Sequence, residues 1–513
     1  MFFFFDYEGL RQNSPTQTVR IVPVAAVRAG GLNYINSNPG CTAQARLNTQ
    51  PDCITTLTAT QVAALDPSGV GADQALLSLF NSRYPSPNDP SAGDGVNTEG
   101  FLFNAPSFLK ENTYVGRVDF NLTSKHKLFA RGTWDRDNNT QETAQFPGDP
   151  SALIGNISHN RSFVIGYTWT ISNTLVNNVF AGLTRNLSDF PALFAPTAPS
   201  LFLFGQNEDL TAPFGSFSSQ ARNVAVPEVR EALYWSKGRH TMEFGADIKP
   251  IREFSKLANS INFPVIGMGG NINQLDPTLR PADINHAQSA KNEYDGFFPV
   301  VLGRFASSST NFNYDVPGNP LPIGSPAIRH YAYNEFEFHA QDTFRLRPDL
   351  TITYGLRWQY HAVPYETNGF ESILNVDEQT LFDARQTAAA QGLNGNTAAP
   401  LISSILAGPK NNGPDYYRPD YKDFAPRIGI AYSPSFTSGL LGALFGDHKT
   451  VVRVGSSIVY DRVLNTLEFE LDQENFLFSN SVPQTFGAPG DATTSLATDP
   501  RFSGLSTPPL VTT

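Results

Sequence analysis

The sequence predicts an all-β protein, an antiparallel β-barrel that spans a membrane. Segments of roughly 9–13 residues alternate apolar and polar side chains, and short connections alternate strictly with long ones. Such alternation indicates strands, because successive side chains of a strand project to opposite sides. Charged residues make up only 16% of the chain, against about 25% in a typical soluble domain, which argues against a heavily solvated surface.

The clearest example is the stretch 113–135. Val118 and Phe120 fall on one side of the predicted strand, and Arg117 and Asp119 fall on the other. The alternation breaks for three residues and then resumes, as expected for two strands joined by a tight turn. This stretch therefore predicts a hairpin with one apolar and one polar face.

The same pattern recurs along the chain. It predicts about eleven strands, at residues 2–9, 113–122, 126–135, 161–171, 175–186, 229–236, 240–252, 329–343, 350–362, 424–433 and 449–462. After the first strand they form hairpins with short turns, such as "SNT" and "KGR"; the last link is longer and contains "GLLGALFG".

Long intervals separate these hairpins. They cover residues 10–110, 136–159, 187–228, 253–328 and 363–423, are rich in Pro, Gly, Asn, Ser and Asp, and read as loops without structure. Outer-membrane barrels combine short periplasmic turns with long extracellular loops in this way. A large soluble β-sandwich also explains the alternation, but it does not predict the asymmetry of the connections.

The two faces of the predicted strands differ in charge. Trp134, Trp169 and Trp358 lie on the apolar faces, as in the aromatic girdles at a membrane boundary. The opposite faces are predicted to line a polar lumen, because charges are costly in lipid. The predicted lumen-facing residues are Arg117, Asp119, Arg131, Asp135, Glu243, Asp247, Lys249, Arg357 and Arg453. Arg117 with Asp119, and Arg131 with Asp135, are expected to form cross-strand pairs.

Composition bounds the remaining possibilities. Cys41 and Cys53 are the two cysteines, and we predict a loop disulfide in an oxidising compartment, the alternative being two unrelated thiols. The net charge of −11 disfavours a nucleic-acid partner, since phosphate binding needs a basic surface. No stretch approaches 18 uninterrupted apolar residues, so no membrane-spanning helix is predicted.

Motifs for catalysis and cofactors do not stand in the sequence, so no enzyme activity, cofactor or metal is predicted. His339 and His361 fall on polar positions of neighbouring strands, but two ordinary lumen residues are the better interpretation. Asp135, Asp137 and Asn139 have the spacing of a calcium loop, but its later Gly and Glu are missing, so the start of a solvated outer loop is preferred.

Several phrases resemble a known family. They are "FFFFDYEGLRQ" (2–12), "VPVAAVRAGGL" (22–32), "NTYVGRVDFNLTSKHKLFARGTWD" (112–135), "GRHTMEFGADIK" (238–249), "QDTFRLRPDLTITYGLRWQY" (341–360), "DFAPRIGIAYSP" (423–434) and "KTVVRVGSSIVYDR" (449–462). As an ordered set they resemble the barrel of TonB-dependent outer-membrane transporters of the Oar-like type.

This resemblance implies a barrel of about 22 strands around a plug domain, driven by the TonB energy-coupling complex. With about eleven strands, and without a signal peptide or plug-like region, the chain is expected to be a fragment. Residues 1–465 are expected to form a partial barrel in the outer membrane lipid of a Gram-negative bacterium, and residues 466–513 an extracellular loop-like tail.

The expected function is uptake of an unidentified substrate. Two alternatives remain. One is a structural or adhesive surface barrel without active transport, and the other is a soluble secreted enzyme or lectin that is rich in β-structure.

Overall fold

A computed structural model defines the fold. It describes residues 1–140, 144–148, 155–191, 202–203, 210–213, 219–258, 262–266, 275–395, 402–462, 476–485 and 501–502.

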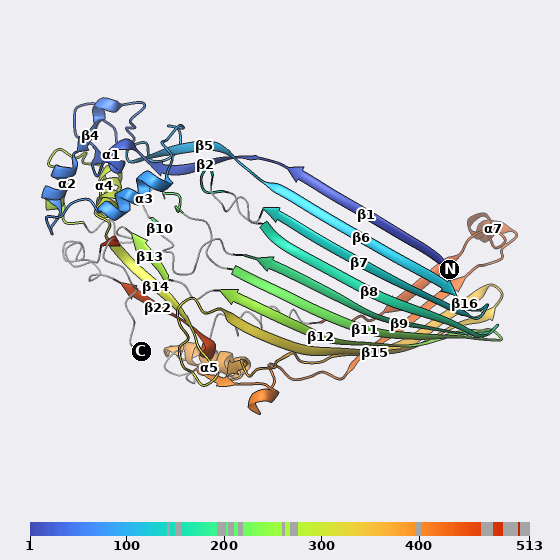
Figure 1. Cartoon of the computed structure of the whole chain (residues 1–513). Helices are drawn as coiled ribbons and strands as arrows, with labels where there is room; N and C mark the ends of the chain where they lie inside the picture. The colour runs from blue at the N-terminus through green and yellow to red at the C-terminus, as the bar shows by residue number, and fades with distance from the viewer. Residues whose placement is uncertain are drawn as a thin grey trace.

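One large antiparallel sheet dominates the molecule (Figure 1). It holds 12 strands, eleven of them in one path that keeps chain order while other elements of the chain lie outside it. In path order these are β1 (Phe2–Asn13), β6 (Phe108–Asn121), β7 (His126–Thr140), β8 (Gly155–Ser172), β9 (Leu175–Phe190), β11 (Ser219–Lys237), β12 (His240–Ala258), β15 (Ala327–Arg347), β16 (Leu350–His361), β20 (Asp423–Tyr432) and β21 (Val452–Ser457). The short β17 (Tyr365–Glu366) pairs with β15 off this path.

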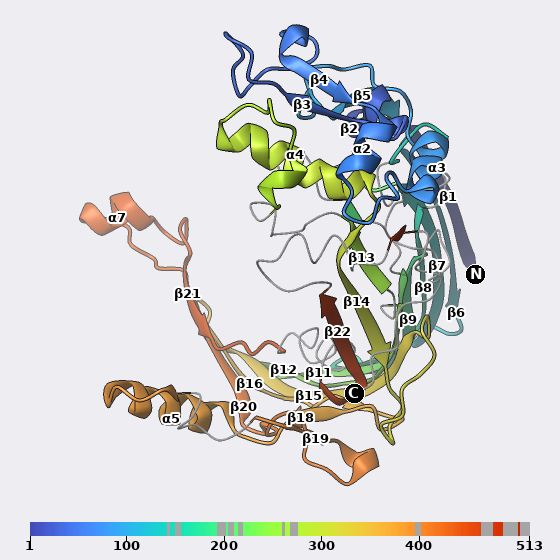
Figure 2. The same cartoon turned by 90° about the vertical axis from the view of Figure 1, so that its left-hand side faces the viewer.

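The sheet curves into an open arc (Figure 2). Within the described residues, its path ends at β1 on one side and at β21 on the other. The predicted antiparallel partial barrel is confirmed, and the eleven path strands follow the predicted order. Most strands are longer than predicted, as in β11, which begins at Ser219 rather than at residue 229. The period-two pattern weakens there because polar residues occupy both faces, whereas the backbone ladder continues.

The connections are as asymmetric as predicted. At one end, the strands are joined through residues 122–125, 173–174, 238–239 and 348–349, with a longer link at 433–451. Gly238 has a φ of 61° in its two-residue turn, a conformation that glycine adopts without steric cost. At the other end, the connections span 14–107, 141–154, 191–218, 259–326 and 362–422.

The expectation that these long connections lack structure was wrong for four of them, because 14–107, 191–218, 259–326 and 362–422 all contain helices or strands. Residues 16–105 and 275–305 fold together into a compact unit beyond the long-loop end of the sheet, which we call the outer domain (Figure 1). It contains β2 (Thr16–Pro23), α1 (Ala25–Arg28), β3 (Leu32–Ile35), η1 (Pro51–Cys53), β4 (Ile54–Leu57), α2 (Ala59–Leu65), α3 (Gln74–Arg83), β5 (Thr98–Ala105), η4 (Pro277–Leu279) and α4 (Gln288–Val301). β2 pairs with β5, and β3 pairs with β4.

Local capping begins two of these helices. Thr58 and Gln61 form a reciprocal capping box at the start of α2. The side chain of Asp73 accepts a hydrogen bond from the backbone N–H of Leu76 at 3.0 Å and caps α3. Both helices are short and depend on packing against the rest of the outer domain.

A shared apolar core holds the two parts of the outer domain together. Leu76 and Phe80 of α3 lie in one buried cluster with Phe297 and Phe298 of α4. The hydroxyl group of Tyr34 donates to Asp283 at 2.7 Å across the same boundary. The core is therefore assembled from residues more than two hundred positions apart in the sequence.

Smaller elements complete the long-loop end. β10 (Phe202–Leu203), β13 (Asn262–Ile266), β14 (Phe305–Asn313) and β22 (Ser479–Thr485) form a second sheet, and η6 (Phe476–Phe478) precedes β22. β18 (Ser372–Leu374) pairs with β19 (Ser404–Leu406), near α5 (Glu378–Ala390) and η5 (Pro409–Asn411). At the short-turn end, α7 (Gly439–Phe445) follows β20. None of the helices in the described part of the chain has the length and apolarity that a membrane span requires.

Candidate functional site: the charged wall of the sheet

The large sheet has one charged and one apolar face. Residues paired in register project to the same side, so Arg230, Asp247 and Glu337, which pair in turn across three strands, share a side. Val229, Ile248 and Phe336 form the adjacent row and project to the opposite side. We call these sides the charged wall and the apolar face.

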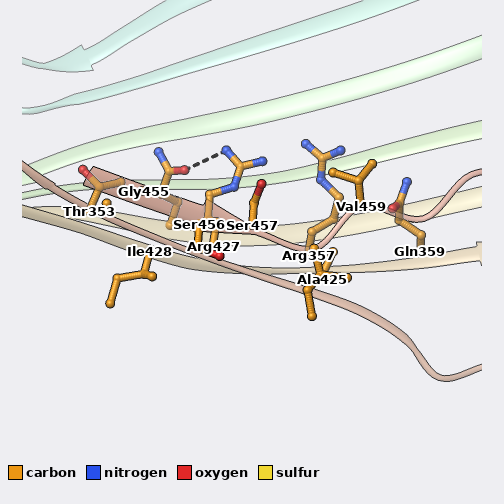
Figure 3. Close-up of a pocket in the computed structure, with 13 residues that line it drawn as sticks. Thr353, Arg357, Gln359, Ala425, Arg427, Ile428, Gly455, Ser456, Ser457 and Val459 are labelled. Atoms are coloured by element: carbon orange, nitrogen blue, oxygen red, sulfur yellow. Dashed lines mark hydrogen bonds between the residues drawn. The ribbon is translucent and has the colours of Figure 1, made fainter. Parts of the chain in front are cut away.

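The charged wall is the concave side of the arc. In Figure 3, Arg357 and Arg427 project toward the side on which the other strands of the sheet lie, and Ile428 projects away from it. Figure 2 shows that the sheet curves around this side. The alternation therefore places charges inside the arc and apolar residues outside.

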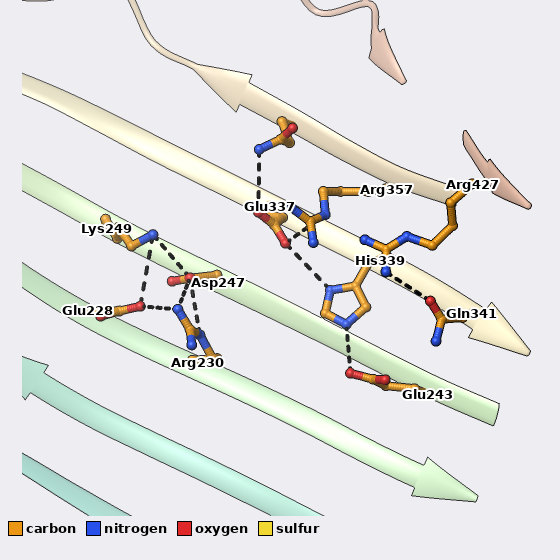
Figure 4. A network of polar contacts seen from close by, with 11 residues as sticks. Glu228, Arg230, Glu243, Asp247, Lys249, Glu337, His339, Gln341, Arg357 and Arg427 are labelled. Atoms are coloured by element: carbon orange, nitrogen blue, oxygen red, sulfur yellow. Dashed lines mark hydrogen bonds and ion pairs between the residues drawn. The ribbon is translucent and has the colours of Figure 1, made fainter. Parts of the chain in front are cut away.

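One cluster of ion pairs spans β11 and β12 (Figure 4). Arg230 Nη2 lies 2.8 Å from Glu228 Oε1 and 3.0 Å from Asp247 Oδ2. Lys249 Nζ lies 3.1 Å from the same Asp247 oxygen and 3.9 Å from Glu228. The two cations and two carboxylates balance each other, which a polar interior stabilises and lipid does not.

A second group continues the wall across β12, β15 and β16 (Figure 4). His339 contacts Glu243 at 3.4 Å through Nε2 and Glu337 at 3.6 Å through Nδ1. Arg357 Nε lies 3.2 Å from Glu337, and the amide of Gln359 donates to Glu337 at 3.5 Å. These contacts tie neighbouring strands together side chain to side chain.

An open recess of about 550 Å³ lies where the wall reaches β20 and β21 (Figure 3). Arg357, Gln359, Arg427 and Ser457 are among its lining residues. Arg427 Nη1 donates to Gln341 Oε1 at 3.0 Å. The recess thus offers several hydrogen-bond donors on one wall, a chemistry suited to polar solutes.

The predicted lumen residues are distributed over this wall. Glu243, Asp247, Lys249 and Arg357 belong to the two ion-pair groups. Arg453 pairs in register with Ala431 at the β21 edge and is exposed.

The expected pairs on β6 and β7 differ from the prediction. Arg117 and Asp119 do pair, at 2.8 Å, but within one strand rather than across two. Asp135 accepts hydrogen bonds from Thr113 at 2.8 Å and Asn160 at 3.3 Å. Among the described ion pairs none joins Arg131 to Asp135, because these residues lie four positions apart on β7.

Sequence reasoning missed some members of the wall. Glu228 belongs to it, but the predicted strand began one residue later, at 229. Arg230 also belongs to it and was left out of the predicted lumen residues, although it lies inside that strand. Arg427 was also missed, although it alternates with Pro426 and Ile428. Extending the period-two pattern past Pro227 would have found Glu228, and applying it to every residue of the predicted strands would have found Arg230 and Arg427.

The rejected metal sites stay unsupported by the described residues. His339 pairs in register with Arg357, whereas His361 pairs with Glu335 further along β15. Asp135, Asp137 and Asn139 lie within β7, not at the start of a loop as expected. In the described part of the chain, no group of three or more His, Cys, Asp or Glu residues is arranged to hold a metal ion.

Cys41 and Cys53 are joined by a disulfide bond in the outer domain. Cys53 is buried beside Ile35 and Val96, and Cys41 packs against the same small cluster. The bond ties the segment between β3 and β4 to the pair of strands that it connects.

A family model described as an outer membrane beta barrel domain matches residues 1–512. No curated protein matches by sequence. The chain is similar to solved structures of the outer membrane transporter YddB from Escherichia coli, with 11% identity, a TM-score of 0.33, and coverage of 67% of this chain and 40% of that one. It is also similar to BauA, the ferric preacinetobactin receptor from Acinetobacter baumannii, with 10% identity, a TM-score of 0.32, and coverage of 65% and 47%.

A further similar structure is the ferric enterobactin receptor PfeA from Pseudomonas aeruginosa, with 11% identity, a TM-score of 0.29, and coverage of 64% and 41%. The match thus spans less than half of each of these chains. The family match covers nearly the whole sequence and agrees with an apolar face opposite a charged wall. The chain belongs to the outer membrane beta barrel domain family, and its place is the outer membrane.

Proposed function

We propose that this chain forms the wall of a TonB-dependent receptor barrel that takes up a polar substrate. The observation that carries the proposal is the continuous charged wall on the concave side of β11, β12, β15 and β16. A lipid-embedded sheet has no use for such a wall unless it faces water, a plug or a solute. The recess at Arg357 and Arg427 is the part of the wall where we expect a solute to bind.

The proposal includes two partners that the sequence resemblance implies. A plug domain fills the space in front of the charged wall, and the TonB energy-coupling complex acts on that plug. Ion pairs such as Arg230 with Asp247 then contribute to the surface on which the plug rests. Residues 466–513 belong to the extracellular side in this proposal, which the pairing of β22 with β14 supports.

A second candidate is a surface barrel that binds a partner without active transport. The outer domain favours this second candidate, because it has a disulfide bond and an apolar core of its own, unlike an ordinary connecting loop. Such a unit can present a stable binding surface to another cell or molecule.

Thiol labelling in intact cells separates the two candidates. Both native cysteines form the disulfide, so a Gln359→Cys variant introduces a single free thiol in the wall. Active transport moves the plug, so labelling of this thiol by a membrane-impermeant maleimide is expected to fall when a protonophore collapses the proton-motive force. A matched Gln379→Cys variant, at an exposed position of α5 outside the wall, is reached from water and is expected to be insensitive to the protonophore.

Equal labelling of Gln359→Cys with and without the protonophore contradicts energised transport and favours the surface-barrel candidate. A parallel loss at Gln379→Cys would mean that the protonophore perturbs labelling in general rather than the wall.

A further inference from the structure

A row of aromatic and cationic side chains crosses the apolar face on β6, β7, β8 and β9. Tyr114 pairs in register with Trp134, Trp134 with Arg161, and Arg161 with Arg185. All four side chains are exposed. They project to the same side as Val118, which lies four residues from Tyr114 on β6, so this row belongs to the lipid-facing surface.

The row borders a groove of about 500 Å³. Gly116 lies opposite Gly132 in the register, and a side chain added at either would meet nothing within 4 Å. These two glycines form an open floor, and Phe163 and Leu183 are among the apolar residues that line it. A groove of this kind on a lipid-facing surface accommodates an acyl chain.

Both arginines are held in place without a carboxylate partner. The guanidinium group of Arg161 lies 4.0 Å from the ring centroid of Trp134, a cation–π contact. Arg185 Nε donates to the side-chain oxygen of Asn223 at 2.8 Å. Among the ion pairs of the described residues, none involves Arg161 or Arg185.

The charges around the row are mostly positive. On the lipid-facing side of these strands, the next positions toward the long-loop end add Arg136, His159 and Lys110. Among the described residues on this side of β6, β7, β8 and β9, Asp189 is the one carboxylate. It pairs in register with Ile157 rather than with either arginine. This side of the four strands therefore carries four Arg and Lys side chains and one Asp. The excess of positive charge can attract an anion.

The height of the row matches a lipid headgroup. Ile171 lies near the short turn at the end of β8, and Arg161 lies ten residues away on the same strand. At the usual rise and tilt of barrel strands, this separation is about 25 Å along the membrane normal. This equals the height of the apolar band of an outer-membrane barrel. Because the long connections lie on the extracellular side, Arg161 and Arg185 are at the level of the outer-leaflet headgroups.

We propose that Arg161 and Arg185 bind the phosphate of a phosphorylated lipid of the outer leaflet. Trp134 holds Arg161 beneath that phosphate, and one acyl chain of the lipid lies over Gly116 and Gly132. The cations lie at the level of the headgroup, where the phosphate of such a lipid is found. The apolar floor lies deeper, where its hydrocarbon begins. This site is independent of the proposed transport function, since it lies on the opposite side of the sheet from the charged wall.

Lipid retention measured by native mass spectrometry tests the proposal. The protein is purified from outer membranes in detergent and mixed with diphosphorylated hexa-acylated lipid A, or with the same lipid after removal of both phosphates. We expect the double variant Arg161→Gln/Arg185→Gln to lower the bound fraction of the phosphorylated lipid by about tenfold. The dephosphorylated lipid is expected to bind weakly to both the variant and the parent protein.

Two controls keep the test decisive. Arg131→Gln/Arg453→Gln removes the same charge from exposed arginines of the charged wall, and we expect it to retain the lipid. Gly132→Leu fills the groove without a change of charge, and we expect it to release the lipid, whereas Gly429→Leu, on the charged wall, is expected to retain it.

Three results would overturn the proposal. They are undiminished binding by the Arg161→Gln/Arg185→Gln variant, equal binding of the dephosphorylated lipid, and complete displacement of the lipid by inorganic phosphate at an equal phosphorus concentration. The last result would mean that the arginines take a free anion rather than a lipid.

Discussion

Arg117 and Asp119 form a two-contact ion pair on the charged wall, while Val118 between them projects to the apolar face. The Nε and Nη2 atoms of Arg117 each lie 2.8 Å from a carboxylate oxygen of Asp119. The Arg117 guanidinium also lies 4.2 Å from the ring centroid of Phe129 on the neighbouring strand. Arg117 and Asp119 thus lie on the polar side and Val118 on the lipid side, because successive side chains of a strand project to opposite faces.

This division predicts a different cost for the same substitution on each face. Val118→Arg places a charge in hydrocarbon and is expected to destabilise the folded protein by about 2–4 kcal/mol. Val115→Arg is the matched control on the charged wall of the same strand, opposite Thr133, and is expected to fold normally. The folded fraction is measured from heat-modifiable migration on gels after extraction from outer membranes. Equal loss in both variants would contradict the assignment of the faces.

The Cys41–Cys53 disulfide is expected to stabilise the outer domain and not the barrel. Its loop is short, so chain entropy predicts a contribution of about 3 kcal/mol. Cys41→Ser/Cys53→Ser is therefore expected to expose residues 16–105 to trypsin at a lower temperature, while the heat-modifiable migration of the barrel stays unchanged. A parent protein that is cleaved equally with and without a reducing agent would disprove this role.

Asp66 is expected to be essential for joining the two parts of the outer domain. Its fully buried carboxylate lies 3.4 Å from Arg304 and also pairs with Arg501. Asp66→Ala removes the carboxylate that pairs with Arg304 and Arg501, so a destabilisation of about 3 kcal/mol is expected. The measurement is the denaturant concentration at which limited proteolysis of the outer domain begins. Asp52→Ala, at an exposed position, is the control and is expected to shift that concentration little.

The stability of the outer domain is expected to fall as pH rises. Burial first, and then the negative charge of Asp94, raise the pKa of Glu293 from 4.5 to about 9, with Arg46 opposing. Since the folded state holds this proton more tightly than the unfolded state, the free energy of unfolding decreases between pH 4.5 and 9. The temperature at which trypsin begins to cut the outer domain is the readout across this pH range.

Glu293→Gln is the matched variant for that experiment, because it keeps the shape of the side chain and removes the titration. We expect it to flatten the decline with pH and to raise the stability near pH 8. Asp94 also has a raised pKa, caused by burial, so part of the decline is expected to remain. An unchanged slope in Glu293→Gln would show that Glu293 does not carry the effect.

The predicted strands and the real ones agree where the membrane imposes a pattern. On β16, Leu356 and Trp358 alternate with Arg357 and Gln359, and both the strand and its two faces could be read from these residues. On β11 the pattern begins near Pro227, because further out the strand has polar residues on both faces. Glu228, a member of the charged wall, was missed for this reason.

The outer domain could not be predicted in the same way. Its core joins Leu76 and Phe80 to Phe297 and Phe298, and none of its helices before α4 exceeds ten residues. Short helices carry little periodic signal, and Gly, Pro and Asn between them read as loops.

By itself, the sequence determined the order of the strands, their two faces and the end at which the connections are short, because hydrocarbon and water select side chains locally along each strand. Only the tertiary structure decided which residues of different strands become neighbours. The pairing of Gly116 with Gly132, of Trp134 with Arg161, and of the two distant parts of the outer domain depends on register and on packing between segments, which no local pattern specifies.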